Sequence, residues 1–224
     1  MPRRAVLALT LLLVAACSST SATERTADAR AAQARDLAKR AGLTKPVQDL
    51  LAEYAASVAQ PFSATYDVVG ASRRLVIDND PPRRRVAQVA TAGGAEAEAD
   101  TFVLGSRSYL CKQQAGQWSC TRTAAPAPVA TAFDSDTVDR TVSALVDARS
   151  NYDYKVTPRR VVDVDATCLV ATPTGPAATA ATLCLSAEGV PLVIQTPSLS
   201  LQVVRYSRHV DTARFRLPAP PTNS

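Results

Sequence analysis

The chain has 224 residues, 46% of them hydrophobic and 20% charged, which is enough length and apolar content for one ordinary folded domain. This composition excludes a wholly disordered chain. The formal net charge of +5 is mild, and only one dense basic run occurs, so the sequence does not indicate nucleic-acid binding.

The first elements are those of an export signal. Met1–Arg4 is basic, residues 5–16 are apolar, and Cys17 follows two alanines and precedes a run of Ser and Thr. Such a start, with an apolar stretch of about 7–15 residues, is typical of a secretory signal and is too short to span a bilayer. The segment Val14-Ala15-Ala16-Cys17 resembles the lipobox of a bacterial lipoprotein.

That resemblance implies that residues 1–16 are removed and that Cys17 carries a thioether-linked diacylglycerol. Two acyl chains anchor a protein stably, whereas one gives only marginal membrane binding. We therefore expect an exported protein anchored to the outer face of the cell membrane, with residues 17–27 as a flexible tether. The alternative is an ordinary signal peptide in which Cys17 is incidental.

Three segments have helical patterns. Residues 26–41 are alanine-rich, and residues 47–58 repeat apolar side chains at helical spacing. A third helix is predicted from the apolar stripe of Val138, Val142, Leu145 and Val146, and Asp136 with Asp139 resembles its N-terminal cap.

From Phe62 the pattern changes to the alternation of half-buried strands. Further strand-like runs cover 73–77, 84–91, 101–104, 108–113, 117–122, 161–170, 182–186, 192–196, 199–206 and 212–217. Strands linked as hairpins indicate an antiparallel sheet, and the amphipathic helices must cover one of its faces. The predicted class is α+β, in one domain over 28–217 with a disordered tail over 218–224.

Four cysteines remain beyond the lipobox, and an even number in an exported protein suggests disulfides. A two-residue turn at Ala115-Gly116 would place Cys111 opposite Cys120 in a non-hydrogen-bonded pair, with Cα atoms roughly 4.5 Å apart.

Cys168 and Cys184 are likewise symmetric about a turn near Gly175-Pro176. We therefore predict the disulfides Cys111–Cys120 and Cys168–Cys184. A four-cysteine metal site is the alternative, but the close cysteine pairs of zinc sites are absent from the sequence.

Signatures of catalysis are absent from the sequence. It has no G-x-S-x-G, S-x-x-K or H-E-x-x-H motif and no phosphate-binding glycine loop. Its one histidine, His209, is interpreted as a surface residue. We predict no catalytic residue, no cofactor and no metal site, and hence no enzyme.

Two acidic pairs and one basic run are weaker candidates. Asp78-Asn79-Asp80 is expected to form a turn, whereas Asp163 and Asp165 would share a strand face, where paired carboxylates can bind a cation or transfer protons. Pro81-Pro82-Arg83-Arg84-Arg85 is interpreted as a solvated turn that leads into a strand, with contact to anionic headgroups or wall polymers as the alternative. Trp118 is expected to pack beside the hairpin disulfide.

The order of the elements resembles the LolA-like lipoprotein carrier and actinobacterial lipoproteins of the LppX and LprG kind. The shared features are the lipobox, the helix that leads into Phe62–Tyr66, the Pro81-Pro82-Arg83 turn, the mid-chain helix and the closing 213–218 segment. The resemblance implies an antiparallel half-barrel whose concave face is covered by helices, with an apolar cavity for acyl chains.

We therefore expect a membrane-anchored envelope lipoprotein that binds or carries a lipid, lipoglycan or other apolar ligand. The anchor and the two predicted disulfides depart from the soluble carrier, and no ligand-binding residue is carried over. The alternative is a structural or protein-interaction lipoprotein with a filled core.

Overall fold

The computed structural model describes residues 22–91, 97–126, 131, 133–176, 179–196 and 199–223. Among these, the helices are α1 (Ala22–Arg40), α2 (Lys45–Ala56) and α4 (Ser135–Asp147), with short 3₁₀ turns η1 (Ser57–Ala59), η2 (Ala148–Asn151) and η3 (Thr212–Phe215). The strands are β1 (Phe62–Val68), β2 (Arg73–Asp80), β3 (Arg83–Ala90), β4 (Ala97–Leu104), β5 (Arg107–Gln114), β6 (Gln117–Thr123), β7 (Tyr152–Val161), β8 (Val164–Pro173), β9 (Ala181–Leu185), β10 (Pro191–Gln195), β11 (Ser200–Ser207) and β12 (Pro221–Asn223).

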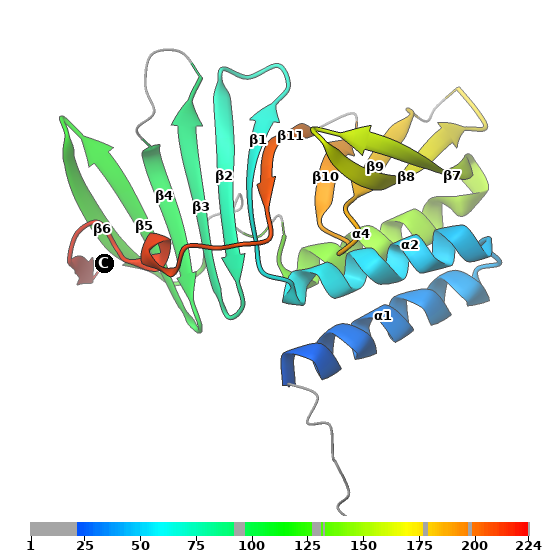
Figure 1. Ribbon diagram of the computed structural model, residues 1–224, viewed down its shortest axis with the longest axis horizontal. Coiled ribbons are helices and arrows are strands. Elements are labelled where there is room, and N and C mark those ends of the chain that lie inside the picture. The colour runs from blue at the N-terminus through cyan, green and yellow to red at the C-terminus, as the bar shows by residue number, and fades with distance from the viewer. Residues whose placement is uncertain are drawn as a thin grey trace, which may run out of the picture.

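All strands belong to one open sheet in the order β12-β6-β5-β4-β3-β2-β1-β11-β10-β9-β8-β7. Its neighbours are antiparallel except β12 and β6. The helices cover the end that holds β7–β10, and β2–β6 extend beyond them (Figure 1). The predicted class, an α+β half-barrel with helices on its concave face, is therefore confirmed.

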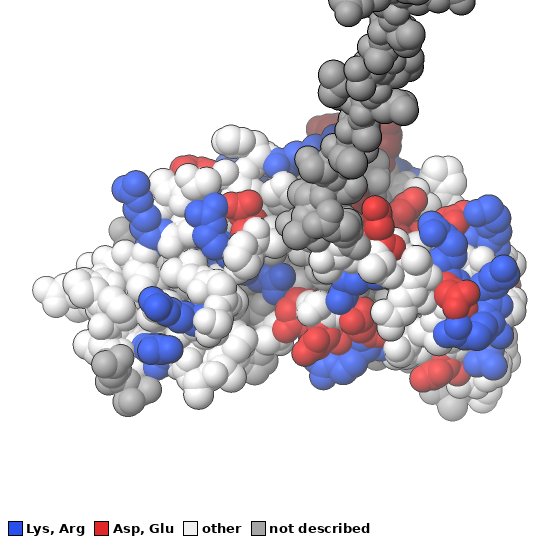
Figure 2. All heavy atoms as spheres, turned by 90° about the horizontal axis from the view of Figure 1, so that it is seen from below, with Lys and Arg blue, Asp and Glu red and all other residues white. Residues whose placement is uncertain are grey.

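The helices are layered on the sheet. α2 packs against β7 and β8, α4 lies beside α2, and α1 is outermost on α2. On the face seen in Figure 2, charged side chains of both signs gather over the helical end, whereas the other end is mostly white with scattered Lys and Arg. None of the described helices is long and apolar enough to cross a membrane.

Both sequence-predicted stripes face the interior. In α2 the buried positions include Val47, Leu50 and Tyr54, and burial of such side chains contributes about 1.5–3 kcal/mol each. The cap of α4 differs from the prediction. Asp134, which precedes the helix, accepts a hydrogen bond from the Thr137 amide at 2.8 Å, because a capping side chain must lie just outside the first turn.

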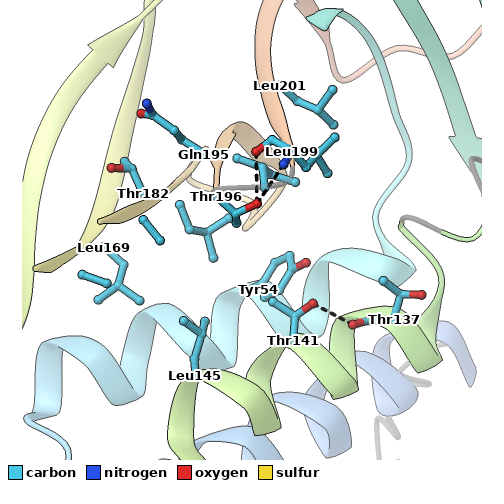
Figure 3. A pocket seen from close by; sticks show the side chains of 14 residues that line it. Tyr54, Thr137, Thr141, Leu145, Leu169, Thr182, Gln195, Thr196, Leu199 and Leu201 are labelled. Atoms are coloured by element: carbon cyan, nitrogen blue, oxygen red, sulfur yellow. Dashed lines mark hydrogen bonds between the residues drawn. The ribbon is translucent and has the colours of Figure 1, made fainter. Parts of the chain in front are cut away.

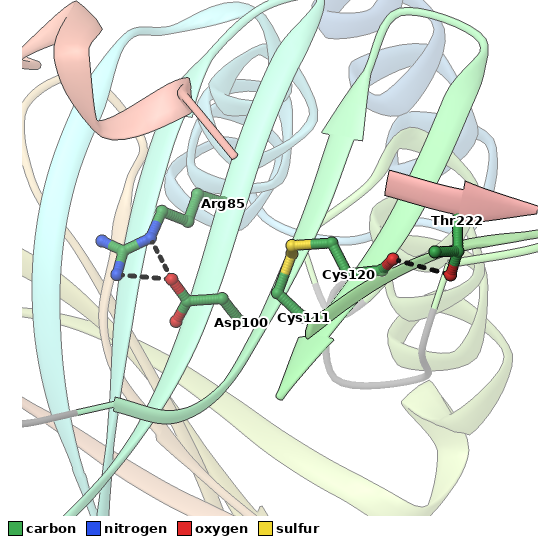
Figure 4. Close-up of a disulfide and its surroundings, with 5 residues drawn as sticks. All are labelled: Arg85, Asp100, Cys111, Cys120 and Thr222. Atoms are coloured by element: carbon green, nitrogen blue, oxygen red, sulfur yellow. Dashed lines mark hydrogen bonds and ion pairs between the residues drawn. A yellow bond between two sulfur atoms is a disulfide. The ribbon is translucent and has the colours of Figure 1, made fainter. Parts of the chain in front are cut away.

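The predicted hairpin register is present. Ala115 and Gly116 have φ values of 50° and 78°, as a tight hairpin turn requires, and Cys111 pairs with Cys120. The structure contains the Cys111–Cys120 disulfide, shown in Figure 4, and the Cys168–Cys184 disulfide, in which the cysteines are register partners on β8 and β9. These are the two predicted pairings.

The N-terminal segment differs from the predicted flexible tether. α1 begins at Ala22, so the described part of the predicted tether (17–27) is helical, because alanine favours a helix and Ala34 buries its side chain in the cluster around α2. Residues 1–21, with the predicted signal segment 1–16 and Cys17, lie outside the described residues.

The predicted disordered tail (218–224) instead contains strand β12 at Pro221–Asn223. Leu217 and Ala219 pack on the cluster around Phe102 and the first disulfide, and the Thr222 hydroxyl donates to the Cys120 carbonyl at 3.2 Å (Figure 4). The strand is held because this segment buries apolar side chains and satisfies backbone groups of the edge strand β6.

Candidate functional site

An apolar hollow of about 250 Å³ lies between helices α2 and α4 and strands β8–β11, and we call it the helix–sheet hollow (Figure 3). Its helical side consists of Tyr54, Thr137, Thr141 and Leu145. Its strand side consists of Leu169, Ala171, Ala181, Thr182, Leu183, Ile194, Gln195, Thr196, Leu199 and Leu201. None of these 14 residues is charged.

Strand register explains the aliphatic wall. Leu169 pairs with Leu183, Leu183 with Ile194, and Ile194 with Leu201, so one row of side chains crosses four strands. Alternation places Cys168 and Cys184, which precede and follow this row on β8 and β9, in the core cluster on the opposite face. The Cys168–Cys184 disulfide is the next register pair beside this row, and it holds β8 and β9 in the alignment that forms the wall.

Tyr54 contributes a buried hydroxyl to the helix–sheet hollow. Its side chain is 2% exposed, and burial raises its pKa to about 12, although a hydrogen bond with Thr141 acts in the opposite direction. The Thr141 hydroxyl also donates to the Thr137 carbonyl at 2.8 Å (Figure 3). The phenol is therefore neutral at physiological pH, and the wall carries no charge on this side.

The helix–sheet hollow continues into a wider groove of about 510 Å³ that is more open to solvent. Both share residues of α4 and of the strands, among them Leu145 and Ala171. The groove adds Arg140, Tyr152 and Tyr154, and the two tyrosine rings stack with centroids 6.1 Å apart. The two spaces together thus form an apolar channel that is narrower at the helix–sheet hollow and more open at the groove.

No protein-family model and no curated protein matches this sequence. Solved structures share parts of the arrangement. A complex of Pseudomonas aeruginosa MucA and MucB has 18% identity and a TM-score of 0.48, covering 75% of this chain and 60% of that chain. MucB in complex with MucA(peri) has 16% identity and a TM-score of 0.48, covering 76% and 59%.

LprF from Mycobacterium bovis has 11% identity and a TM-score of 0.43, covering 79% of this chain and 99% of that chain. The chain thus spans about three fifths of the MucB chains in those two complexes.

The basic run forms the turn at Pro81-Pro82 and the start of strand β3, as predicted, whereas residues 78–80 belong to β2 rather than to a turn. Each arginine is half-buried and faces a polar partner. Arg83 pairs with Asp80 and lies over the Phe215 ring, Arg84 donates to Asn79 at 2.9 Å, and Arg85 contacts Asp78 at 3.2 Å and Asp100 at 2.8 Å. The arginines are less solvated than expected because cross-strand register places each of them opposite a polar residue of β2.

The remaining candidates lie apart from the helix–sheet hollow. Asp163 is in the β7–β8 turn with φ 61°, so it does not share a strand face with Asp165; both are exposed and each lies 3.9 Å from Arg160. Within the described part of the chain, no three His, Cys, Asp or Glu side chains gather as a metal site. His209 is exposed, and Trp118 packs against the disulfide cluster.

Sequence reasoning did not name the residues of the helix–sheet hollow. The stripe of α4 and the alternation in β8–β11 were the available signals, and each predicts only a buried face. Whether two buried faces meet tightly or leave a space depends on side chains that are distant in sequence.

Proposed function

We propose that the protein holds an apolar chain, such as the acyl chain of a lipid or lipoglycan, in the helix–sheet hollow. The observation that carries this proposal is an uncharged, largely aliphatic hollow with an open extension. An apolar cavity of about 150 Å³ accommodates benzene, so the 250 Å³ of the helix–sheet hollow would accommodate about ten carbon atoms. A longer chain would follow the groove past Tyr152.

The lining favours binding over the alternatives. Aliphatic, hydroxyl and amide groups hold a ligand by contact and orientation, whereas acid–base catalysis needs titrating groups poised near neutral pH. A purely structural lipoprotein would be expected to fill the space between sheet and helices. Burial of ten methylenes contributes about 8 kcal/mol to binding. Because binding also costs translational and conformational entropy, we expect micromolar or weaker affinity.

A fluorescent polyene fatty acid, cis-parinaric acid, tests the proposal by titration against the full-length protein. We expect saturable binding in the wild type and its loss in Ala171→Phe, because Ala171 is buried in the wall. Thr172→Phe is the matched control, since Thr172 is exposed on the opposite face of β8. Absent binding, or equal binding by folded Ala171→Phe, would overturn the proposal.

We also propose that Cys17 anchors this module to the outer face of the cell membrane. The lipobox-like sequence supports this location. We expect Cys17→Ala to leave the protein soluble or uncleaved on fractionation. Membrane anchoring equal to that of the wild type would contradict the proposal without affecting the ligand assay.

A further inference from the structure

A second hollow, of about 460 Å³, lies on the sheet face that points away from the helices, and we call it the outer hollow. Its floor is formed by Thr65, Val76 and Ala87, which are consecutive register partners on β1, β2 and β3. Their short side chains leave a depression between larger neighbours. Ala64 and Tyr66, on either side of Thr65, face the opposite way into the core.

Three arginines from distant parts of the chain surround this floor: Arg85, Arg205 and Arg214. Arg85 is held by Asp78 and Asp100, and Figure 4 shows its side chain reaching across to Asp100 on β4. Those carboxylates have side chains only 0% and 5% exposed. They therefore brace the arginine from beneath, and an incoming ligand meets guanidinium groups first.

Two of these cations can bind an incoming ligand. Arg214 contacts Asp78 through one nitrogen at 3.1 Å, and its side chain is 44% exposed. Arg205 is exposed beside Thr65, and it makes no ion pair with any residue that the structure describes. The outer hollow thus presents more positive than negative charge to solvent.

Trp118 forms another wall of the outer hollow. It is half-buried against the cluster around the Cys111–Cys120 disulfide, which fixes it in place. An indole offers a flat surface with an N–H donor at its edge. The outer hollow therefore combines guanidinium groups, a hydroxyl-bearing floor and an aromatic wall, and this combination suits an anionic ligand with a compact polar body.

We propose that the outer hollow binds a phosphate ester of about the size of a sugar phosphate, with its phosphate between Arg205 and Arg214 and its body toward Trp118. Guanidinium groups match phosphate geometry and form charge-assisted hydrogen bonds to it. The same chemistry occurs in a free sugar phosphate and in a phosphorylated glycolipid headgroup. The site is independent of the helix–sheet hollow.

The test uses Trp118 as its reporter, because it is the one tryptophan in the chain. Titration of the full-length protein with glucose 6-phosphate at low salt should change tryptophan emission, whereas glucose should not. Arg205→Gln should weaken binding about fivefold or more. Arg159→Gln is the matched control, because Arg159 is an exposed arginine on β7 at the other end of the sheet.

Vesicles identify the source of the phosphate. A lipid headgroup is supported if the protein associates more strongly with phosphatidylinositol-containing vesicles than with phosphatidylcholine vesicles and if Arg205→Gln loses this difference. A free ester is supported if the protein binds glucose 6-phosphate but associates equally with both kinds of vesicle. No emission change up to about 10 mM glucose 6-phosphate, or equal affinity in folded Arg205→Gln, would overturn the proposal. Binding of cis-parinaric acid should be unchanged in Arg205→Gln, which separates this outcome from the first proposal.

Discussion

Gly189, in the turn between β9 and β10, lies directly against the backbone of α2. A Cβ atom at this position would be 2.1 Å from the Glu53 carbonyl oxygen, whereas ordinary contact begins at 3.4 Å. The turn is held by hydrogen bonds from the Gly189 amide to Ser186 and from the Ser186 amide to Val190, each 2.9 Å. Gly189→Ala must therefore separate the turn from the helix by about 1 Å or more.

Two costs determine the size of this effect. Gly189 has φ 78°, a left-handed conformation that costs a non-glycine residue about 1–2 kcal/mol. Forcing extra atoms into a packed contact costs about 1–3 kcal/mol more. Gly116→Ala is the matched control, because Gly116 also has φ 78° but has nothing within 4 Å of an added Cβ.

We expect Gly189→Ala to lower the free energy of unfolding by about 2–5 kcal/mol and Gly116→Ala by about 1–2 kcal/mol, with the larger loss in Gly189→Ala. Equilibrium urea unfolding of the oxidised protein measures both. Binding of cis-parinaric acid should weaken in Gly189→Ala alone, because the added atom would also lie 3.3 Å from the amide nitrogen of Tyr54, which lines the helix–sheet hollow. Equal losses of stability in the two variants would refute the proposed contact between turn and helix.

Three further predictions concern charge, ionisation and cross-links. Asp78→Asn should destabilise by about 3 kcal/mol in urea, because it removes the buried carboxylate that contacts Arg85 and Arg214. The exposed Asp163→Asn should change stability by less than about 0.5 kcal/mol. Since burial raises the pKa of Tyr54 from 10.0 to about 12, its neutral form is favoured in the folded state, and this stabilisation is complete below pH 10 and lost as the pH rises through 12. The stability of the wild type relative to Tyr54→Phe should therefore fall by about 2–3 kcal/mol over that window, and a constant difference would contradict the assigned burial. Replacing Cys168 and Cys184 by alanine should cost about 3 kcal/mol for a sequence separation of 16, and non-reducing peptide mapping that links cysteines of different hairpins would contradict the registers.

Patterns confined to neighbouring residues were predictable. The apolar stripe of α2, the alternation of β1 and the symmetric cysteine spacing of β5–β6 each depend on one helical or strand period or on one turn. The α+β class follows from their order along the chain. The predictions failed where a segment's state depends on distant partners, as for β12, which exists because the tail packs on β6 and the Phe102 cluster.

The sequence by itself determined the class of fold, the two disulfide pairings and the absence of known catalytic motifs. Only the tertiary structure decided where the two hollows lie and which charged side chains surround the outer hollow. The row from Leu169 to Leu201 crosses four strands, and the outer hollow joins Arg85 to Arg214, 129 positions later in the chain. Local periodicity predicts which face of an element is buried, but a cavity is the volume left between faces that meet only after the chain has folded.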